Sequence, residues 1–138
     1  MGEQRLTLLG DDAGQLQFEG RTAYGDPVRV GGDPHGLGAK PSDLLPISLA
    51  ACTAYDVVVI LRKQRQQLRG LDVRIHTEQD ADPPWAFRRI HLHFVITGTV
   101  DEQKAARAIE LADAKYCAVS ATIRPTVEIA LSQEIVPG

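Results

Sequence analysis

The chain has 138 residues, of which 43% are hydrophobic and 24% are charged, and its formal net charge is −3 at pH 7. This composition is typical of a globular protein and excludes disordered and collagen-like chains. The small negative charge argues against a basic surface that would bind nucleic acid. The basic residues cluster only in RKQRQQLR at 62–69, which we interpret as a solvent-exposed helix end. A chain of this length predicts a single domain, 1–138, with its own core.

The first thirty residues contain three short alternating runs, RLTLLG, QLQFEG and DPVRVG, bounded by Gly and Asp turn signals. They predict three strands of an antiparallel meander. Residues 31–41, GGDPHGLGAKP, hold four Gly and two Pro and therefore predict a loop. This loop directly precedes an apolar segment, a place where loops commonly carry function.

A long helix is predicted from Ser42, a good N-cap residue, to Gly70, which could supply a left-handed C-cap. Residues 44–61 are nearly continuously apolar, so a membrane span has to be considered. Pro46 near the start and Asp56 in the interior make a lipid-facing span costly. We therefore predict a helix buried in a core or clamped at a dimer interface, and no membrane segment.

Beyond Gly70, apolar and polar residues alternate over 71–80 and again over 87–98. The two segments predict a hairpin with one solvent-exposed and one buried face. A capping-box spacing from Thr99 to Glu102 predicts a second, amphipathic helix over 101–117. A last strand is predicted over 126–136. Strands interrupted by helices without βαβ alternation indicate an α+β domain. The buried hairpin face is expected to comprise Ile90, Leu92, Phe94 and Ile96.

The chain has two cysteines, Cys52 in the apolar helix and Cys117 at the end of the second helix, without CxxC spacing. This argues against a zinc ribbon or a secreted disulfide scaffold. The N-terminus lacks the pattern of a signal peptide, so a reducing cytoplasm is the expected setting. No nucleotide-binding or GxSxG motif is present, and we expect no bound cofactor or metal.

Each cysteine taken alone could be a small buried hydrophobe. A nucleophilic cysteine instead needs a nearby positive group, and the spacing leaves Arg21, Arg29 and Arg124 open as candidates. Asp56 lies one helical turn after Cys52 and would disfavour its thiolate unless an arginine lies beside both. The alternative for Asp56 is an ion pair that satisfies a buried charge.

Two further groups of side chains have less specific patterns. Tyr55 is expected to be a core or interface aromatic. His91 and His93 share one face of a strand, and His76 on the partner strand could face them, an arrangement that could bind zinc. Neighbouring arginines disfavour a divalent ion there, and the alternative is a polar, solvent-facing stripe.

Two stretches, GAKPSDLLPISLAACTAYDVV and DAKYCAVSATIRPTVEI, resemble the two signatures of the OsmC and organic hydroperoxide resistance family. The resemblance covers roughly residues 15–135. It implies an α+β fold with antiparallel sheets around a long central helix and a second, shorter helix, in an intertwined homodimer. It also implies a cysteine-based peroxidase that reduces organic hydroperoxides.

By the same resemblance, Cys52 corresponds to the peroxidatic cysteine and Cys117 to the resolving one, joined in a thiol–disulfide cycle through a sulfenic acid. The reductant implied is a dithiol, typically a lipoyl-bearing protein. The family's activating arginine would be Arg21, with Arg29 as second choice. The family's glutamate ten residues before the first cysteine is replaced by Ser42, and Asp56 would then orient the arginine.

Two alternatives stay open from the sequence. One is a non-enzymatic binding or stress-related protein that uses the same cleft for a small apolar or thiol-bearing ligand, with an inactive thiol. The other is a histidine-bound metal protein.

Overall fold

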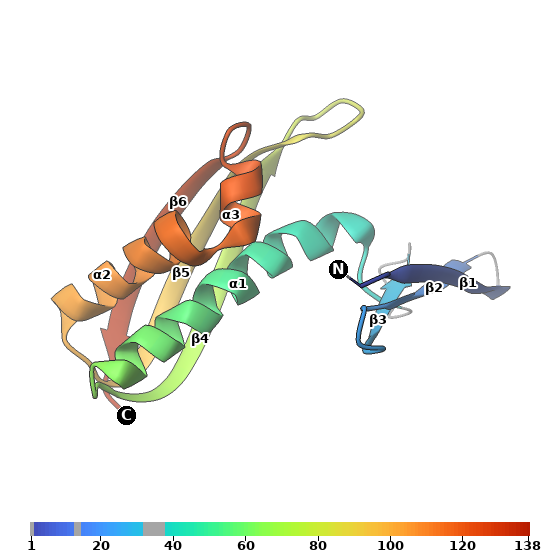
Figure 1. The fold of residues 1–138 in the computed structure, drawn as a ribbon. Coiled ribbons are helices and arrows are strands. Elements are labelled where there is room, and N and C mark those ends of the chain that lie inside the picture. Colours follow the sequence, from blue (N-terminus) through green and yellow to red (C-terminus); the bar gives the residue numbers. More distant parts are fainter. Residues whose placement is uncertain (1, 13–14, 32–37) are drawn as a thin grey trace. The chain divides into compact units, whose positions relative to one another are not determined.

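The computed structural model describes residues 2–12, 15–31 and 38–138 (Figure 1). The chain divides into two compact units, Met1–Leu45 and Pro46–Gly138, and each is described by itself. The expectation of a single domain over 1–138 stays a prediction.

The first unit is an antiparallel sheet in the order β1-β2-β3, which confirms the predicted meander. Its strands are β1 (Arg5–Asp12), β2 (Gln15–Arg21) and β3 (Pro27–Gly31). Most of the predicted loop at 31–41 lies outside the described residues. At its described end, Ala39 forms a bridge to Val30 of β3.

Helix α1 (Pro41–Lys63) begins one residue before Ser42, so Ser42 lies in its first turn instead of capping it, and the helix ends seven residues before Gly70. Its C-terminus is closed by hydrogen bonds from Gln66 N–H to Leu61 O (3.0 Å) and from Arg65 N–H to Arg62 O (3.0 Å). Arg65 occupies the left-handed position, with φ of 59°, that we assigned to a glycine. The prediction of Gly70 as the C-cap is therefore wrong, because pairing with β5 takes residues from Gln67 onward into a strand.

The second unit contains a sheet in the order β4-β5-β6, formed by β4 (Gln67–Gln79), β5 (Phe87–Thr99) and β6 (Glu128–Val136). Strands β4 and β5 form the predicted hairpin. Strand β6 runs parallel to β5, so this sheet is mixed rather than wholly antiparallel. The parallel direction follows from the helical crossover that connects β5 to β6.

Helices α1 and α2 (Glu102–Leu111) lie on the same side of this sheet (Figure 1). The expected hairpin face is confirmed, since all four of its apolar residues have no exposed surface. Leu49, Val57 and Leu61 of α1 are equally buried, and α2 adds Ala105 and Ala108. The core of the second unit is thus a helical layer packed on one face of the sheet.

The region predicted as one helix over 101–117 contains two helical pieces, and a further helix follows it. Helix α2 is capped by Asp101, whose carboxylate accepts the Lys104 N–H at 3.0 Å, whereas Thr99 belongs to β5. A π-helix, η1 (Ala112–Tyr116), follows. Cys117 then adopts extended backbone angles and starts α3 (Ala118–Ile123), a helix that the sequence analysis missed. Cys117 thus lies directly after the helical stretch of α2 and η1, as predicted, and also begins the next helix.

Helix α1 is long and apolar enough to cross a membrane by length and composition alone. The same properties are found in core helices of soluble proteins. Thr53 shows how α1 accommodates a polar group in the core, because its buried hydroxyl donates to Leu49 O (2.9 Å) and Ala50 O (3.1 Å). The burial of Leu49, Val57 and Leu61 against the sheet favours the core interpretation.

Candidate active site

Cys52 is half-buried on α1 and packs against the core cluster of the second unit. The cysteine lies on the helix between buried positions and exposed ones: Thr53 has no exposed surface, whereas Tyr55 is 73% exposed. A thiol at this border can touch the core and still be reached from outside. Both cysteines are free thiols.

Cys117 lies at the junction of η1 and α3 and is only 3% exposed. Its sulfur accepts the Ser120 N–H at 3.2 Å, so the cysteine itself caps α3. The extended backbone at Cys117 turns its side chain into the core rather than continuing the helix.

The two thiols are neighbours although they are far apart in the sequence. Burial, followed by a hydrogen bond with the Cys52 side chain, raises the pKa of the Cys117 thiol from 9.0 to about 11. The backbone N–H groups of Ser120 and Val119 act in the opposite direction, since they favour the thiolate. The structure therefore brings the two predicted cysteines together, and Cys117 is neutral at pH 7.

This raised pKa predicts how Cys117 should react with iodoacetamide. Since only the thiolate is alkylated, the rate should stay low up to pH 9 and gain about tenfold per pH unit up to about 11. Pulse labelling followed by peptide mass spectrometry measures this profile, with circular dichroism to check that the chain stays folded. A midpoint at or below 9.0, the ordinary thiol value, would contradict the assigned environment.

A polar cluster next to Cys117 comprises Asp113, Ser120 and Arg124. Ser120 donates to Asp113 Oδ1 at 2.5 Å, and Arg124 donates to Asp113 Oδ2 at 2.9 Å and to Ser120 Oγ at 2.6 Å. Arg124, one of three candidate activating arginines, is thus bound to a carboxylate of its own. The cluster holds the start of α3. The sequence analysis did not single out Asp113 and Ser120, although both lie in the second family signature, because the fold is needed to show that their side chains meet.

Asp56 forms no hydrogen bond or ion pair with any residue that the structure describes. It lines a hollow of about 410 Å³. Its role as a partner of an arginine therefore stays a prediction. Tyr55 is exposed, so its assignment to the core is wrong, while the interface alternative is untested. The other residues around the Asp56 hollow are Val59, Ile60, Lys63, Gln64 and Tyr116.

Arg21 and Arg29 both belong to the first unit, where they share one carboxylate. Arg21 Nε lies 3.0 Å from Glu19 Oε1 and its guanidinium also donates to Gly25 O at 2.7 Å. Arg29 Nε lies 3.6 Å from Glu19 Oε2. Glu19 is thus an arginine-orienting carboxylate that the sequence analysis did not single out. The relation of either arginine to Cys52 stays a prediction.

The histidines lie where predicted, on the polar face of the second sheet, with the rings of His76 and His91 at 6.2 Å between centroids. His91 and His93 both contact Ser132, and His93 also contacts Glu134. Across the described ranges, no three His, Cys, Asp or Glu side chains come together in a way that could hold a metal ion. The zinc hypothesis thus gains no support.

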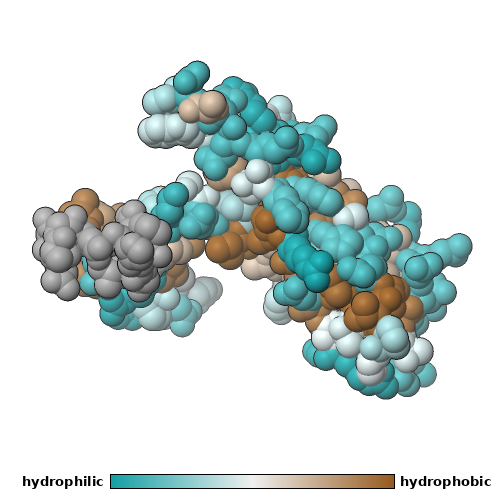
Figure 2. Space-filling model, turned by 180° about the vertical axis from the view of Figure 1, so that it is seen from behind, coloured by the Kyte–Doolittle hydropathy of each residue, from teal (hydrophilic) through white to brown (hydrophobic). Residues whose placement is uncertain are grey.

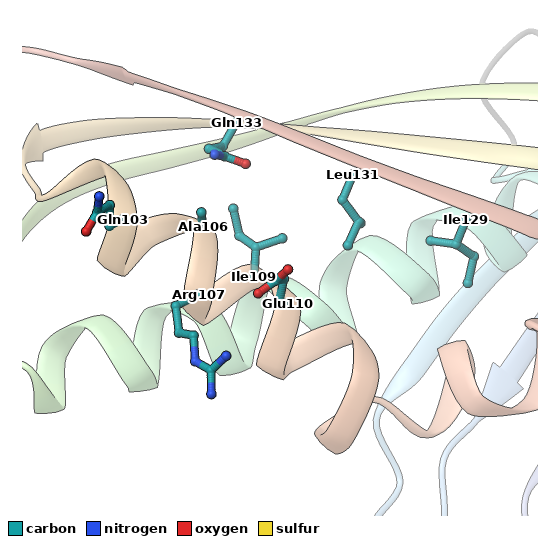
Figure 3. Close-up of a pocket in the computed structure, with 8 residues that line it drawn as sticks. All are labelled: Gln103, Ala106, Arg107, Ile109, Glu110, Ile129, Leu131 and Gln133. Carbon is teal, nitrogen blue, oxygen red and sulfur yellow. The ribbon is translucent and has the colours of Figure 1, made fainter.

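A further hollow of about 470 Å³ lies between α2 and β6 (Figure 3). Ile109 of α2 and Leu131 of β6 line it, and Arg107 and Glu110 add charge at its rim. It contains no thiol or imidazole, so the chemistry of this chain is better sought at the cysteine pair.

Residues 32–132 match the family model of the OsmC-like protein. The chain belongs to the OsmC-like family. Protein YhfA of Escherichia coli K12 is 33% identical to this chain over 122 residues, which are 88% of this chain and 91% of YhfA. The family signatures identified in the sequence are thereby confirmed.

Solved structures agree with the OsmC-like fold. A hypothetical protein from Aquifex aeolicus VF5 superposes with a TM-score of 0.86 at 26% identity, covering 100% of this chain and 98% of that one. The organic hydroperoxide resistance protein OhrB of Bacillus subtilis superposes with a TM-score of 0.62 at 17% identity, covering 96% and 98%. The α+β fold with two sheets and a long helix is thus that of the OsmC-like family.

Proposed function

We propose that this OsmC-like protein is a thiol peroxidase that reduces organic hydroperoxides through Cys52 and Cys117. The observation that carries the proposal is the contact between the two thiols in the second unit. Membership of the OsmC-like family and the likeness in fold to a protein named for organic hydroperoxide resistance support it. A role in the oxidative stress response in the cytoplasm follows from the same proposal.

In the proposed cycle, the Cys52 thiolate attacks the terminal oxygen of the hydroperoxide. The O–O bond breaks, the alcohol leaves with a proton, and Cys52 becomes a sulfenic acid. The Cys117 sulfur then attacks the Cys52 sulfur, the sulfenic hydroxyl leaves with the Cys117 proton as water, and a disulfide forms. A dithiol, such as a lipoyl-bearing protein, restores both thiols.

The raised pKa of Cys117 supports this division of roles. Attack on a peroxide requires a thiolate, which Cys117 does not provide at neutral pH. A resolving thiol instead reacts with an electrophilic sulfur that is already held beside it, so proximity offsets its weaker nucleophilicity. Cys52, which is less buried and closer to the surface, is the better peroxidatic candidate.

One equivalent of tert-butyl hydroperoxide is expected to convert the reduced chain into a form with one Cys52–Cys117 disulfide. Peptide mapping without reduction measures this, and hydrogen peroxide serves as the comparison oxidant. Two free thiols after the peroxide has been consumed, or cross-links only between chains, would contradict the proposed pairing.

A second candidate function is the non-enzymatic binding module. The observation that favours it is that, within the described ranges, no cation is bonded to Cys52 to favour its thiolate. This candidate predicts that alkylation of Cys52 rises only above about pH 8.5, as for an ordinary thiol. Alkylation already at its plateau near pH 6 would instead support the peroxidase.

We further propose that the active protein is the homodimer. The first unit is a three-stranded sheet whose apolar residues are exposed, and such a sheet needs a covering surface. Figure 2 likewise shows apolar residues gathered in patches on a mostly hydrophilic surface. Tyr55 adds an exposed aromatic on α1. The exposed apolar residues of the first unit include Leu6, Leu8, Leu9, Leu16 and Val28.

Light scattering is expected to give twice the 15.0 kDa mass of the chain. Tyr55→Asp should shift the protein toward the monomer, because it places a charge on the apolar surface of α1. Trp85→Asp is the matched control, since Trp85 is also exposed but lies in the turn between β4 and β5. A monomeric parent, or equal weakening by both changes, would contradict this interface.

A further inference from the structure

The polar face of the second sheet carries a hydrogen-bonded chain that the thiol chemistry does not use. His91 Nε2 lies 2.7 Å from Ser132 Oγ, and His93 Nδ1 lies 2.6 Å from the same oxygen. His93 Nε2 lies 3.0 Å from Glu134 Oε1. The parallel pairing of β5 with β6 (Figure 1) produces this arrangement, because it sets His93 opposite Ser132.

The chemistry of these groups fixes where the protons lie. An ionised carboxylate only accepts, so His93 Nε2 carries the proton that binds Glu134. In the neutral ring, Nδ1 then has a free lone pair, which accepts the Ser132 hydroxyl proton. Ser132 Oγ in turn accepts the Nε2 proton of His91. The hydroxyl is therefore directed at an imidazole base that a carboxylate holds in place.

This arrangement has the three parts of an activated nucleophile: a hydroxyl, a base within hydrogen-bonding distance, and a group that orients the base. The His93 side chain is 25% exposed and that of Glu134 is 47% exposed, so a small reagent can reach the site. Ser120, by contrast, donates to the carboxylate of Asp113 rather than to an imidazole.

The charged groups around the site differ in whether they are already paired. Arg89 binds Glu128 at 2.6 Å and Glu78 at 3.8 Å. Arg74 is opposite His93 in the strand register and has no ion pair or hydrogen bond within the described part of the chain. Its guanidinium is therefore available to stabilise negative charge that develops on a reacting carbonyl oxygen.

We propose that Ser132 is a second nucleophilic centre, separate from the thiols, that is acylated by small activated esters of carboxylic acids. Ser132 Oγ forms a bond to the acyl carbon while its proton passes to His93 Nδ1. The bond to the leaving group breaks, and the leaving group departs with the electron pair. Water then hydrolyses the serine ester and restores the hydroxyl. Because the site lies on a sheet face, bulky acyl groups gain little binding there.

The test uses the full chain with Cys52→Ser and Cys117→Ser, so that no thiol competes, with circular dichroism to confirm the fold and p-nitrophenyl acetate as the probe. Acid quenching and peptide mass mapping are expected to place an acetyl group on Ser132 rather than on Ser42, Ser48 or Ser120. Acetylation of another serine or of a histidine instead of Ser132, or of no residue, overturns the proposal.

His93→Gln is expected to lower the acetylation rate by about 10²–10⁴-fold, since it removes the base. His76→Gln is the matched control, because its ring lies on the same face without a bond to Ser132, and it should leave the rate unchanged. An unchanged rate in His93→Gln, with a fold confirmed by circular dichroism, overturns the proposal. An equal loss in both variants does so too.

Glu134 acts through His93, so it is a positioning residue. Glu134→Gln should lower the acetylation rate, because the amide no longer holds the His93 ring with Nδ1 toward Ser132. Glu134→Asp keeps a carboxylate and should retain more of the rate than Glu134→Gln, whereas a merely structural role would not separate the two variants. An unchanged rate in Glu134→Gln would contradict the assignment of Glu134 as the positioning residue.

Discussion

Replacing Cys52 with serine is expected to reduce the consumption of tert-butyl hydroperoxide to the rate seen without protein. A serine hydroxyl keeps the volume of the side chain but does not form the nucleophilic anion at neutral pH, so no sulfenic acid can form. The measurement is peroxide loss with a lipoyl dithiol in excess. Consumption at the parent's rate would overturn the peroxidase proposal.

Cys117→Ser is the matched control, because it removes the other thiol of the same pair. Cys52 should still react once with peroxide, and its sulfenic acid should persist long enough to be trapped by a sulfenic-acid reagent. Steady turnover should fall, since no internal thiol is left to form the disulfide. Loss of the first reaction in Cys117→Ser would reverse the roles assigned to the two cysteines.

The parts of the fold that could be predicted are those in which a local pattern determines the structure. Alternation over 87–98 placed Ile90 and Phe94 on the buried face because each strand residue points to the opposite side from its neighbour. The meander in the first unit followed from turn residues. The approximate start of α1 followed from the apolar run that begins at 44, although Ser42 lies inside the helix and not at its cap.

The end of α1 could not be predicted because a tertiary contact overrides the local signal. Gln67 and Leu68 continue a helical pattern, yet they pair with Thr99 and Gly98 of β5. The best helix stop, Gly70, lies at an irregularity in that pairing instead. Helix propensity is worth only a few tenths of a kcal/mol per residue, roughly, so strand pairing decides.

The candidate site likewise has features that the sequence predicted and features that only the fold revealed. The two cysteines were identified from the signatures that carry the family resemblance, and their contact required the fold. The contacts of Ser132 depend on β6 running parallel to β5, a direction that alternation alone does not reveal. Arg124 could be named as a candidate cation but not assigned, because its pairing with Asp113 depends on the π-helix that carries Asp113, which no local pattern predicts.

For the activation of Cys52, the family resemblance selects the arginine, and the structure shows how that arginine is held. The resemblance assigns it to Arg21, and the first unit holds Arg21 against Glu19 and Gly25. Placing a guanidinium beside a thiolate costs less conformational free energy when the guanidinium is already held in position than when it rotates freely. We propose that Glu19 takes the part of the carboxylate that the family places ten residues before the first cysteine, where Ser42 stands here.

Arg21→Gln is therefore expected to lower the rate of peroxide consumption by about 10²–10³-fold, the usual cost of removing one charge-stabilising donor. Arg5→Gln is the matched control, because Arg5 lies in the same sheet and makes a comparable exposed ion pair with Glu3. Glu19→Gln should give a smaller loss of the same kind, since it frees the guanidinium without removing it. A full rate in Arg21→Gln together with a loss in Arg29→Gln would assign activation to Arg29, because Glu19 holds both arginines.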